Sequence, residues 1–231
     1  MPSHLLRLLT ALALAFAPVL RADDQAPAKA HDFAKWESEI AAFEKADAQT
    51  PPAKGGIVFV GSSSIRLWKT LAEDFPQHRV LNRGFGGSEI ADSVHFADRI
   101  VLPYAPRMVV LYAGGNDLNN GRPPEEVFAD FTAFAVKVHA ALPAAEIAYI
   151  SSAGNPARWA QVEKVRALNS LIEGYIRQQT NMKFINVFPR MLGDDGLPKP
   201  GIFVADQLHM NAEGYKLWTE IIRPLLPAAD R

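Results

Sequence analysis

Four short segments of the chain combine glycines with side chains that can do chemistry. Three of them each follow a short apolar run, and the fourth lies near the C-terminus, just before a helical pattern. In chain order the segments are Gly61-Ser62-Ser63-Ser64, Asn82-Arg83-Gly84-Phe85-Gly86-Gly87-Ser88, Ala113-Gly114-Gly115-Asn116-Asp117 and Asp206-Gln207-Leu208-His209. Together they supply the hydroxyl, imidazole, carboxylate and amide groups that acyl transfer requires.

Each role in acyl transfer has a candidate residue. A serine hydroxyl is a poor nucleophile at neutral pH and needs a base within hydrogen-bond reach. His209 can serve as that base, and Asp206, in the same short turn, can orient its ring. The oxyanion needs donors that are placed in advance, and Gly87 offers an unobstructed backbone N–H while Asn116 offers an amide. The residues alone leave open which serine of the first segment attacks.

Short apolar runs bounded by turns predict the buried parallel strands that position these segments. The runs cover residues 57–60, 79–82, 108–112, 146–150 and 183–187, and helical patterns cover 33–43, 123–142, 159–180 and 212–225. Strands that alternate with helices favour a three-layer α/β/α domain with a flavodoxin-like parallel sheet of about five strands. Ligands of such sheets bind at the carboxyl ends of the strands, where the first three segments lie.

The four segments resemble the four blocks of the SGNH hydrolases, also called GDSL-type hydrolases, in their order and in their position at strand ends. The resemblance implies that Ser63 is the nucleophile of a triad with Asp206 and His209. It also implies an oxyanion hole made by the N–H groups of Ser63 and Gly87 and the amide of Asn116. The likeness extends from the first apolar run through the last helix, and it is greatest to bacterial members that resemble platelet-activating-factor acetylhydrolase.

One residue departs from the motif of that family. Ser62 stands where the Gly-Asp-Ser block has aspartate. Since that aspartate is not a triad member, the resemblance implies that the chemistry survives while hydrogen bonding around the oxyanion turn changes. The nucleophile elbow of the α/β-hydrolases fits less well, because it would need glycine where Ile65 stands and a serine that follows a later strand.

Each segment on its own also has an ordinary structural interpretation. Glycine–serine turns commonly cap helices or form phosphate nests. Asparagine–aspartate pairs are common in turns, and an isolated Asp-x-x-His is more often a surface pair. The occurrence of all four segments in order, at strand ends, is what favours an enzyme. Two other functions stay open: an O-acyltransferase with the same triad, and a non-catalytic domain that binds glycans or phosphate.

We therefore predict a serine esterase that hydrolyses short-chain, acetyl-type carboxylic esters through an acyl-enzyme. The candidate substrates are small-molecule esters, glycan esters and lysolipids, and no long apolar insertion indicates a tunnel for a long acyl chain. The reaction requires no cofactor and no metal. A single Asp-x-x-His also falls short of the three protein ligands that a zinc site needs.

Composition limits the partners of the protein. The chain has 231 residues, with 24 basic and 25 acidic side chains and a net charge of −1, which gives no sign of a nucleic-acid partner. The sequence contains no cysteine, so disulfides, thiolate catalysis and a lipid-modified N-terminal cysteine are excluded. Nothing in the sequence fixes the oligomeric state.

The N-terminus indicates export. Residues 1–22 begin with a basic stretch, continue with an apolar run too short to span a bilayer well, and end in a small residue before two aspartates. We expect a signal peptide, a periplasmic or secreted protein, and no stable membrane insertion after its removal; an uncleaved anchor is the alternative. Residues 23–55 then form an N-terminal segment with one packing helix, and residues 56–231 form the hydrolase domain.

Overall fold

The structure is a computed structural model that describes residues 31–229 of the chain. Apart from residues 31 and 32, the described residues belong to the second of two units of the chain, Phe33–Arg231. The predicted signal peptide lies outside the described residues. No helix within residues 31–229 has the length and apolar character needed to cross a membrane. The second unit contains all four of the segments whose side chains can take part in acyl transfer.

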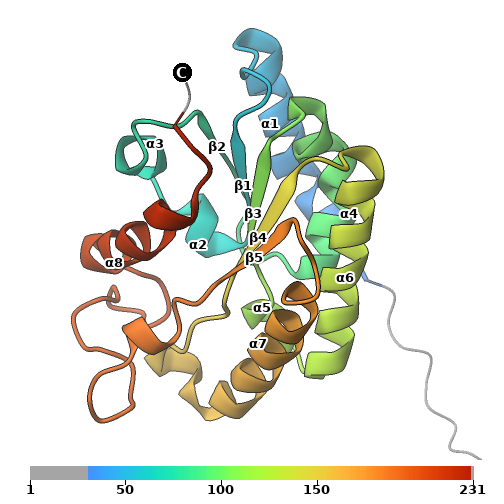
Figure 1. Cartoon of the computed structure of the whole chain (residues 1–231). Helices are drawn as coiled ribbons and strands as arrows, with labels where there is room; N and C mark the ends of the chain where they lie inside the picture. The colour runs from blue at the N-terminus through green and yellow to red at the C-terminus, as the bar shows by residue number, and fades with distance from the viewer. Residues whose placement is uncertain (1–30, 230–231) are drawn as a thin grey trace, which may run out of the picture. The chain divides into compact units, whose positions relative to one another are not determined.

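A five-stranded parallel sheet forms the centre of the second unit (Figure 1). The strands are β1 (Ile57–Gly61), β2 (Val80–Gly84), β3 (Met108–Tyr112), β4 (Glu146–Ile150) and β5 (Met182–Ile185). They lie in the order β2-β1-β3-β4-β5, and each adjacent pair is parallel. The predicted flavodoxin-like fold is therefore confirmed. The winding reverses between β1 and β3, and ligands of such sheets bind outside the strand ends at that point.

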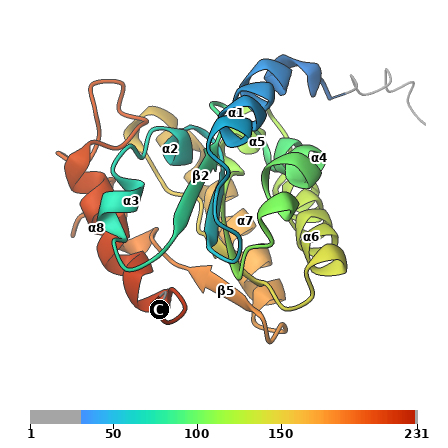
Figure 2. The same cartoon turned by 90° about the horizontal axis from the view of Figure 1, so that it is seen from above.

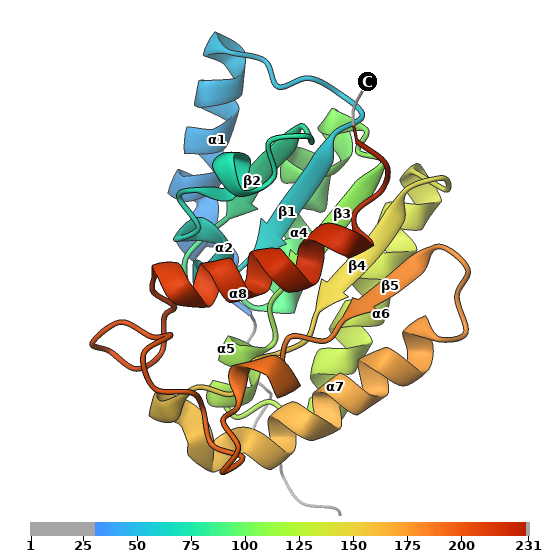
Figure 3. The ribbon, with the colours of Figure 1, turned by 60° about the vertical axis from the view of Figure 1, so that its left-hand side comes forward.

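Helices cover both faces of the sheet (Figures 1 and 2). The α-helices are α1 (Glu37–Gln49), α2 (Ser63–Arg66), α3 (Leu71–Asp74), α4 (Ile90–Ile100), α5 (Gly115–Asn119), α6 (Pro124–Ala141), α7 (Val162–Ile176) and α8 (Ala212–Ile222). Short 3-10 helices occupy Ala34–Trp36, Leu102–Tyr104, Pro156–Gln161, Pro189–Met191 and Arg223–Leu225. One face carries α1, α4, α6 and α7, and the other carries α2, α3 and α8, with α8 lying across the strands in Figure 3.

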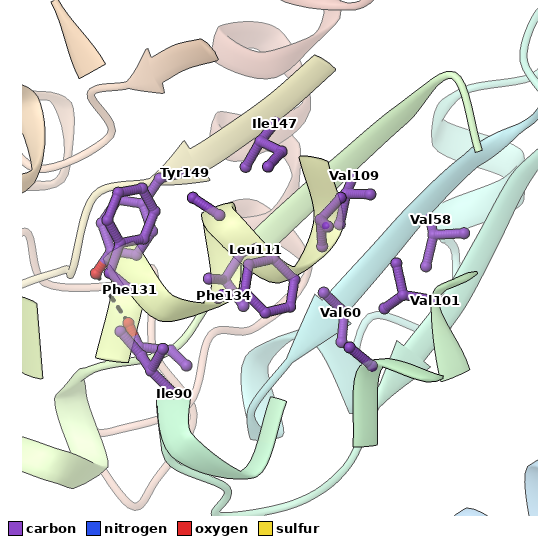
Figure 4. Close-up of a cluster of buried hydrophobic side chains, with 14 of the residues drawn as sticks. Val58, Val60, Ile90, Val101, Val109, Leu111, Phe131, Phe134, Ile147 and Tyr149 are labelled. Atoms are coloured by element: carbon purple, nitrogen blue, oxygen red, sulfur yellow. Dashed lines mark hydrogen bonds between the residues drawn. The ribbon is translucent and has the colours of Figure 1, made fainter. Parts of the chain in front are cut away.

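Successive side chains of each strand point to opposite faces of the sheet, so the core consists of two clusters, one on each face. Val58 and Val60 of β1 belong to the cluster on one face of the sheet, which also contains Phe131 of α6 (Figure 4). The intervening side chains, Ile57 and Phe59, pack on the other face against α3 and α8. All five side chains are at most 1% exposed. Because apolar side chains leave β1 on both faces, its sequence reads as a continuous apolar run.

The predicted strands and long helices are present, with shifted ends. The second strand was expected at residues 79–82 and extends to Gly84, whereas the fifth was expected to reach residue 187 and ends at Ile185. The helix expected at 159–180 covers Val162–Ile176, because the residues before it form a 3-10 helix with a non-helical backbone at Arg158. The side chain of Asn155 accepts the backbone N–H of Arg158 at 3.0 Å, which stabilises this tighter turn.

The end of β1 approaches β3 so closely that only glycine fits there. Gly61 has a φ of +132°, and a Cβ built on it would lie 2.0 Å from the carbonyl oxygen of Tyr112. The next residue continues the contact, since the backbone N–H of Ser62 donates to the same Tyr112 oxygen at 2.9 Å. This approach places the start of α2 beside the end of β3.

We expect Gly61→Ala to lower the free energy of unfolding by about 2 to 4 kcal/mol, because it adds both backbone strain and overpacking. Urea unfolding measures the change. The matched control is Gly174→Ala on α7, where nothing lies within 4 Å of the added Cβ. That control should gain about 0.5 to 1 kcal/mol, as glycine is unfavourable in a helix interior. Equal effects of the two substitutions would contradict this account of the β1–β3 approach.

Candidate active site

Ser63 is the first residue of α2, at the point where the chain leaves β1. Ser62 precedes it as the helix N-cap in extended conformation and is buried. The carbonyl of Ser64 accepts the phenol O–H of Tyr215 at 2.9 Å, which anchors the turn to α8. These contacts differ along the three adjacent serines, and Ser63 is the one whose hydroxyl reaches the histidine of the fourth segment.

The structure brings Ser63, His209 and Asp206 into a hydrogen-bonded line. The Oγ of Ser63 lies 2.9 Å from Nε2 of His209, although the two residues are 146 positions apart. The Nδ1 of the same ring lies 2.7 Å from Oδ2 of Asp206. A neutral imidazole with its proton on Nδ1 would donate to Asp206 and present Nε2 to the serine hydroxyl as an acceptor.

The Asp206 carboxylate is held in place by hydrogen bonds within its own turn. Its Oδ1 accepts the backbone N–H groups of Leu208 at 2.8 Å and His209 at 2.9 Å, which leaves Oδ2 for the imidazole. The backbone hydrogen bond from His209, followed by the bond from its ring and the one from Leu208, lowers the pKa of Asp206 to about 2. The carboxylate therefore stays ionised far below neutral pH, ready to stabilise an imidazolium at His209.

Asn116 lies in the same cleft, with both ends of its amide held. Its Nδ2 donates to the carbonyl of Ser88 at 3.0 Å, and its Oδ1 accepts from Nη1 of Arg158 at 3.0 Å. The bond to Arg158 fixes which end of the amide carries the N–H groups. One Nδ2 hydrogen is engaged by Ser88, so the second is available for another acceptor.

Gly87 lies in the loop between β2 and α4 and is exposed at a φ of +78°. A Cβ at this position would come 3.4 Å from the ring of Trp36. The same indole packs edge-on against Phe85, with 5.7 Å between ring centroids, and the backbone N–H of Gly86 donates to a carboxylate oxygen of Glu39 at 3.2 Å. One side of the loop is thus held by α1 and the 3-10 helix before it.

The α5 region holds the other side of this loop, at residues 88–90. Three side chains reach it: Asn116 contacts Ser88, Asp117 accepts the backbone N–H of Ile90 at 3.0 Å, and Asn120 donates to Glu89 at 2.6 Å. The segments that follow β2 and β3 are therefore connected by direct hydrogen bonds.

A small cleft of about 40 Å³ lies over the serine and histidine. It is much smaller than the roughly 300 to 1,000 Å³ of pockets that enclose drug-sized ligands. Its lining consists of Ser62, Ser63, Ser64, Tyr112, Gly115, Asn116, Ala153, Asn155, Arg158, Leu208 and His209. Within residues 31–229, no group of three or more side chains of the metal-binding types comes together. Gly87 is not part of the lining.

The sheet order and the serine–histidine–aspartate line define an α/β protein with the constellation of an acyl-transfer enzyme. The model of the GDSL-like lipase/acylhydrolase family matches residues 58–217. The chain belongs to this family and is a carboxylic ester hydrolase. No curated protein matches the sequence.

Solved structures share the fold at low sequence identity. One named "a putative platelet activating factor" from Streptococcus pneumonia has a TM-score of 0.74 and 21% identity, over 84% of this chain and 94% of that one. A GDSL-like lipase from Bacteroides thetaiotaomicron VPI-5482 has a TM-score of 0.66 and 21% identity, over 84% and 96% of the two chains. A carbohydrate esterase family 3 protein from Talaromyces cellulolyticus has a TM-score of 0.54 and 18% identity, over 75% and 95%.

Several residues at the site had no assigned role from the sequence. Trp36 packs against the core, and its ring also borders Gly87. Glu39 carried no signal, because its contact with the Gly86 backbone joins distant parts of the chain. Arg158 follows the fourth predicted strand but belongs to none of the four segments. The structure places it in the lining.

Asp117 is a fully buried carboxylate that contacts the loop at residues 88–90. Burial, opposed by the hydrogen bond from Ile90 and reinforced by the charge of Glu89, raises the pKa of Asp117 to about 7. Its Oδ2 has no hydrogen-bond partner, and the Arg122 guanidinium is 3.8 Å from Oδ1. The native state therefore favours the protonated acid relative to the unfolded chain, in which the pKa is about 3.9.

This shift predicts a pH-dependent difference between wild type and Asp117→Asn. The stability contributed by the protonated acid is complete below about pH 4 and is lost as pH rises to about 7. The amide cannot ionise and keeps an acceptor for Ile90. Between about pH 4 and pH 7, the free energy of unfolding of Asp117→Asn should therefore rise relative to that of wild type by about 2 to 4 kcal/mol. Urea unfolding across the interval measures this gain.

The matched control for that experiment is Asp98→Asn, on the exposed side of α4, where the carboxylate pairs with Lys137 at 2.7 Å and is 64% exposed. Its stability should run nearly parallel to wild type, because exposed pairs contribute little. If the free energy of unfolding of Asp117→Asn also ran parallel to that of wild type between about pH 4 and pH 7, the pKa of the buried carboxyl would not be raised.

Proposed function

We propose that the protein is an exported serine esterase that hydrolyses short-chain, acetyl-type esters with Ser63 as nucleophile. The observation that carries the proposal is the line of hydrogen bonds from Ser63 through His209 to Asp206. A serine hydroxyl in contact with the free nitrogen of an imidazole, which a carboxylate orients, is the arrangement that makes serine reactive.

The proposed reaction has two halves. His209 takes the proton of the Ser63 hydroxyl while Oγ attacks the ester carbonyl and forms a tetrahedral intermediate. The backbone N–H groups of Ser63 and Gly87, with the free N–H of Asn116, stabilise the oxyanion. The C–O bond to the alcohol then breaks and the alcohol leaves with the proton from His209. Water, deprotonated by His209, next attacks the acyl-enzyme and releases the acid and the serine.

The size of the cleft supports a short acyl group. About 40 Å³ of space over Ser63 suits an acetyl-sized group better than a long chain. Two proteins of the same fold are named as an acetyl esterase, in a mutant with an acetate ion, and as a carbohydrate esterase. These names favour small acyl groups on glycans or similar alcohols as the substrates to test first.

Hydrolysis is favoured over acyl transfer because the matching family is described as a lipase/acylhydrolase family. The side chain of Asp206 is 47% exposed and that of His209 is 24% exposed, so water can approach the acyl-enzyme. An O-acyltransferase would form the transferred ester in the presence of a glycan acceptor. Appearance of that product as the main one, in place of free acetate, would reverse this choice.

We also propose that the protein acts outside the cytoplasm, on the basis of the basic and apolar pattern in residues 1–22. N-terminal sequencing of the mature protein from cell fractions tests this part. Full-length protein in the cytosol would contradict it.

Ser63→Ala should reduce hydrolysis of p-nitrophenyl acetate by at least about 10⁴-fold, because it removes the attacking atom. The matched control is Ser64→Ala, the adjacent hydroxyl, which should keep most of the activity. Thermal unfolding of both variants checks that the fold is retained. A panel of p-nitrophenyl esters should show turnover falling as the acyl chain lengthens. A Ser63→Ala protein with near wild-type activity would refute the assignment of the nucleophile.

A further inference from the structure

Arg158 occupies a distinctive place in the cleft. It lies in the 3-10 helix after β4 and is half-buried, in a lining that also contains Ser63 and His209. Its Nη1 donates to the carbonyl of Gly115 at 3.2 Å and to Oδ1 of Asn116 at 3.0 Å. The guanidinium is thus in direct contact with the side chain proposed to stabilise the oxyanion.

The charge of Arg158 is not neutralised by the protein. Two other arginines that are shielded from solvent have carboxylate partners: Arg83 pairs with Asp47, and Arg122 pairs with Asp130. Arg158 has no such partner within the described part of the chain. Burial lowers the pKa of Arg158, and the only opposing influence comes from the phenol of Tyr112. The cleft therefore holds a permanently charged cation whose cost of burial no carboxylate offsets.

Part of the guanidinium remains free to bind. A guanidinium has five N–H donors, and Nη1 uses both of its own. The other edge, formed by Nε and Nη2, makes no hydrogen bond in the described structure, and neither atom is sealed from solvent. That edge presents two parallel N–H groups, which is the geometry that carboxylate and phosphate oxygens match.

We propose that Arg158 makes this esterase selective for esters whose alcohol portion carries an anionic group close to the scissile bond. The inference rests on the proposed function at Ser63. The small space over the serine favours an acetyl-sized acyl group, so the anion belongs to the alcohol. Acetylated sugars that bear a carboxylate or a phosphate have this chemistry. The Nε/Nη2 edge binds the anion while Nη1 continues to hold Asn116.

A purely structural role makes a different prediction. If Arg158 only positions the Asn116 amide, its loss slows hydrolysis of charged and neutral esters by the same factor. If Arg158 binds the anion, its loss slows hydrolysis of the charged ester more than hydrolysis of the neutral one. The useful quantity is thus the ratio of two losses, in which the effect on Asn116 and the intrinsic reactivity of each leaving group cancel.

The experiment compares three acetate esters of similar shape. These are 4-acetoxybenzoate, 4-acetoxyphenyl phosphate and the neutral methyl 4-acetoxybenzoate, each assayed with wild type and Arg158→Gln. We expect kcat/KM to fall at least about tenfold more for a charged ester than for the neutral one, since hydrogen bonds to charged groups are strong. The larger of the two charged losses identifies carboxylate or phosphate as the preferred anion. The wild-type preference should weaken as salt rises.

Two further variants make the comparison specific. Arg158→Lys keeps the positive charge but lacks the two parallel N–H groups. We expect its kcat/KM on the charged esters to lie between the values of wild type and Arg158→Gln. Arg177→Gln, beyond the far end of α7, removes an exposed arginine that pairs with Glu173. It should leave the ratio of charged to neutral turnover near the wild-type value.

A measurement on the wild-type enzyme keeps the proposal testable if Arg158→Gln does not fold. Inhibition by the alcohol product 4-hydroxybenzoate should be at least about tenfold tighter than inhibition by methyl 4-hydroxybenzoate. Equal inhibition, or equal losses on charged and neutral esters in Arg158→Gln, would overturn the inference and leave the esterase intact. Absence of Ser63-dependent hydrolysis of all three esters would instead overturn the proposed function.

Discussion

The hydrogen bond between Ser63 and His209 is the constraint on which the arrangement of the site depends. It joins the end of the first strand to a turn 146 residues later, just before the last helix. Neither partner is brought there by local structure. The sheet fixes Ser63 through the close approach of Gly61 to Tyr112, and the packing of α8 across the sheet fixes the turn that carries His209. The packing of the two apolar clusters thus determines the 2.9 Å distance between the Ser63 hydroxyl and the His209 ring.

The loop that carries Gly87 shows how the rest of the site is stabilised. Trp36 and Glu39 contact it from one side, and the α5 region contacts it from the other. Donors for an oxyanion are effective when they are positioned before the reaction and do not have to reorganise. Two independent sets of contacts on a short loop favour such positioning for the donor that we propose at Gly87. The first set comes from residues that precede the part matched by the family model, which begins at residue 58.

Much of this architecture could be predicted from the sequence, for identifiable reasons. The parallel strands bury both faces, so runs such as Met108–Tyr112 are continuous and stand out, and their ends locate the serine, glycine and asparagine segments. The contacts of Glu39 and Arg158 could not be predicted, because they depend on which distant segments meet. The start of α7 was misplaced because the capping bond from Asn155 to Arg158 competes with the helical pattern.

The account depends most directly on Ser63 being an activated nucleophile in the folded protein. Labelling with a fluorophosphonate probe, followed by peptide mass spectrometry, tests this without knowledge of the substrate. We predict one covalent adduct, located on Ser63 by fragmentation, that forms in the native protein and is absent after unfolding or in His209→Ala. An unlabelled native protein, or an adduct on another serine while Ser63 stays free, would contradict the account.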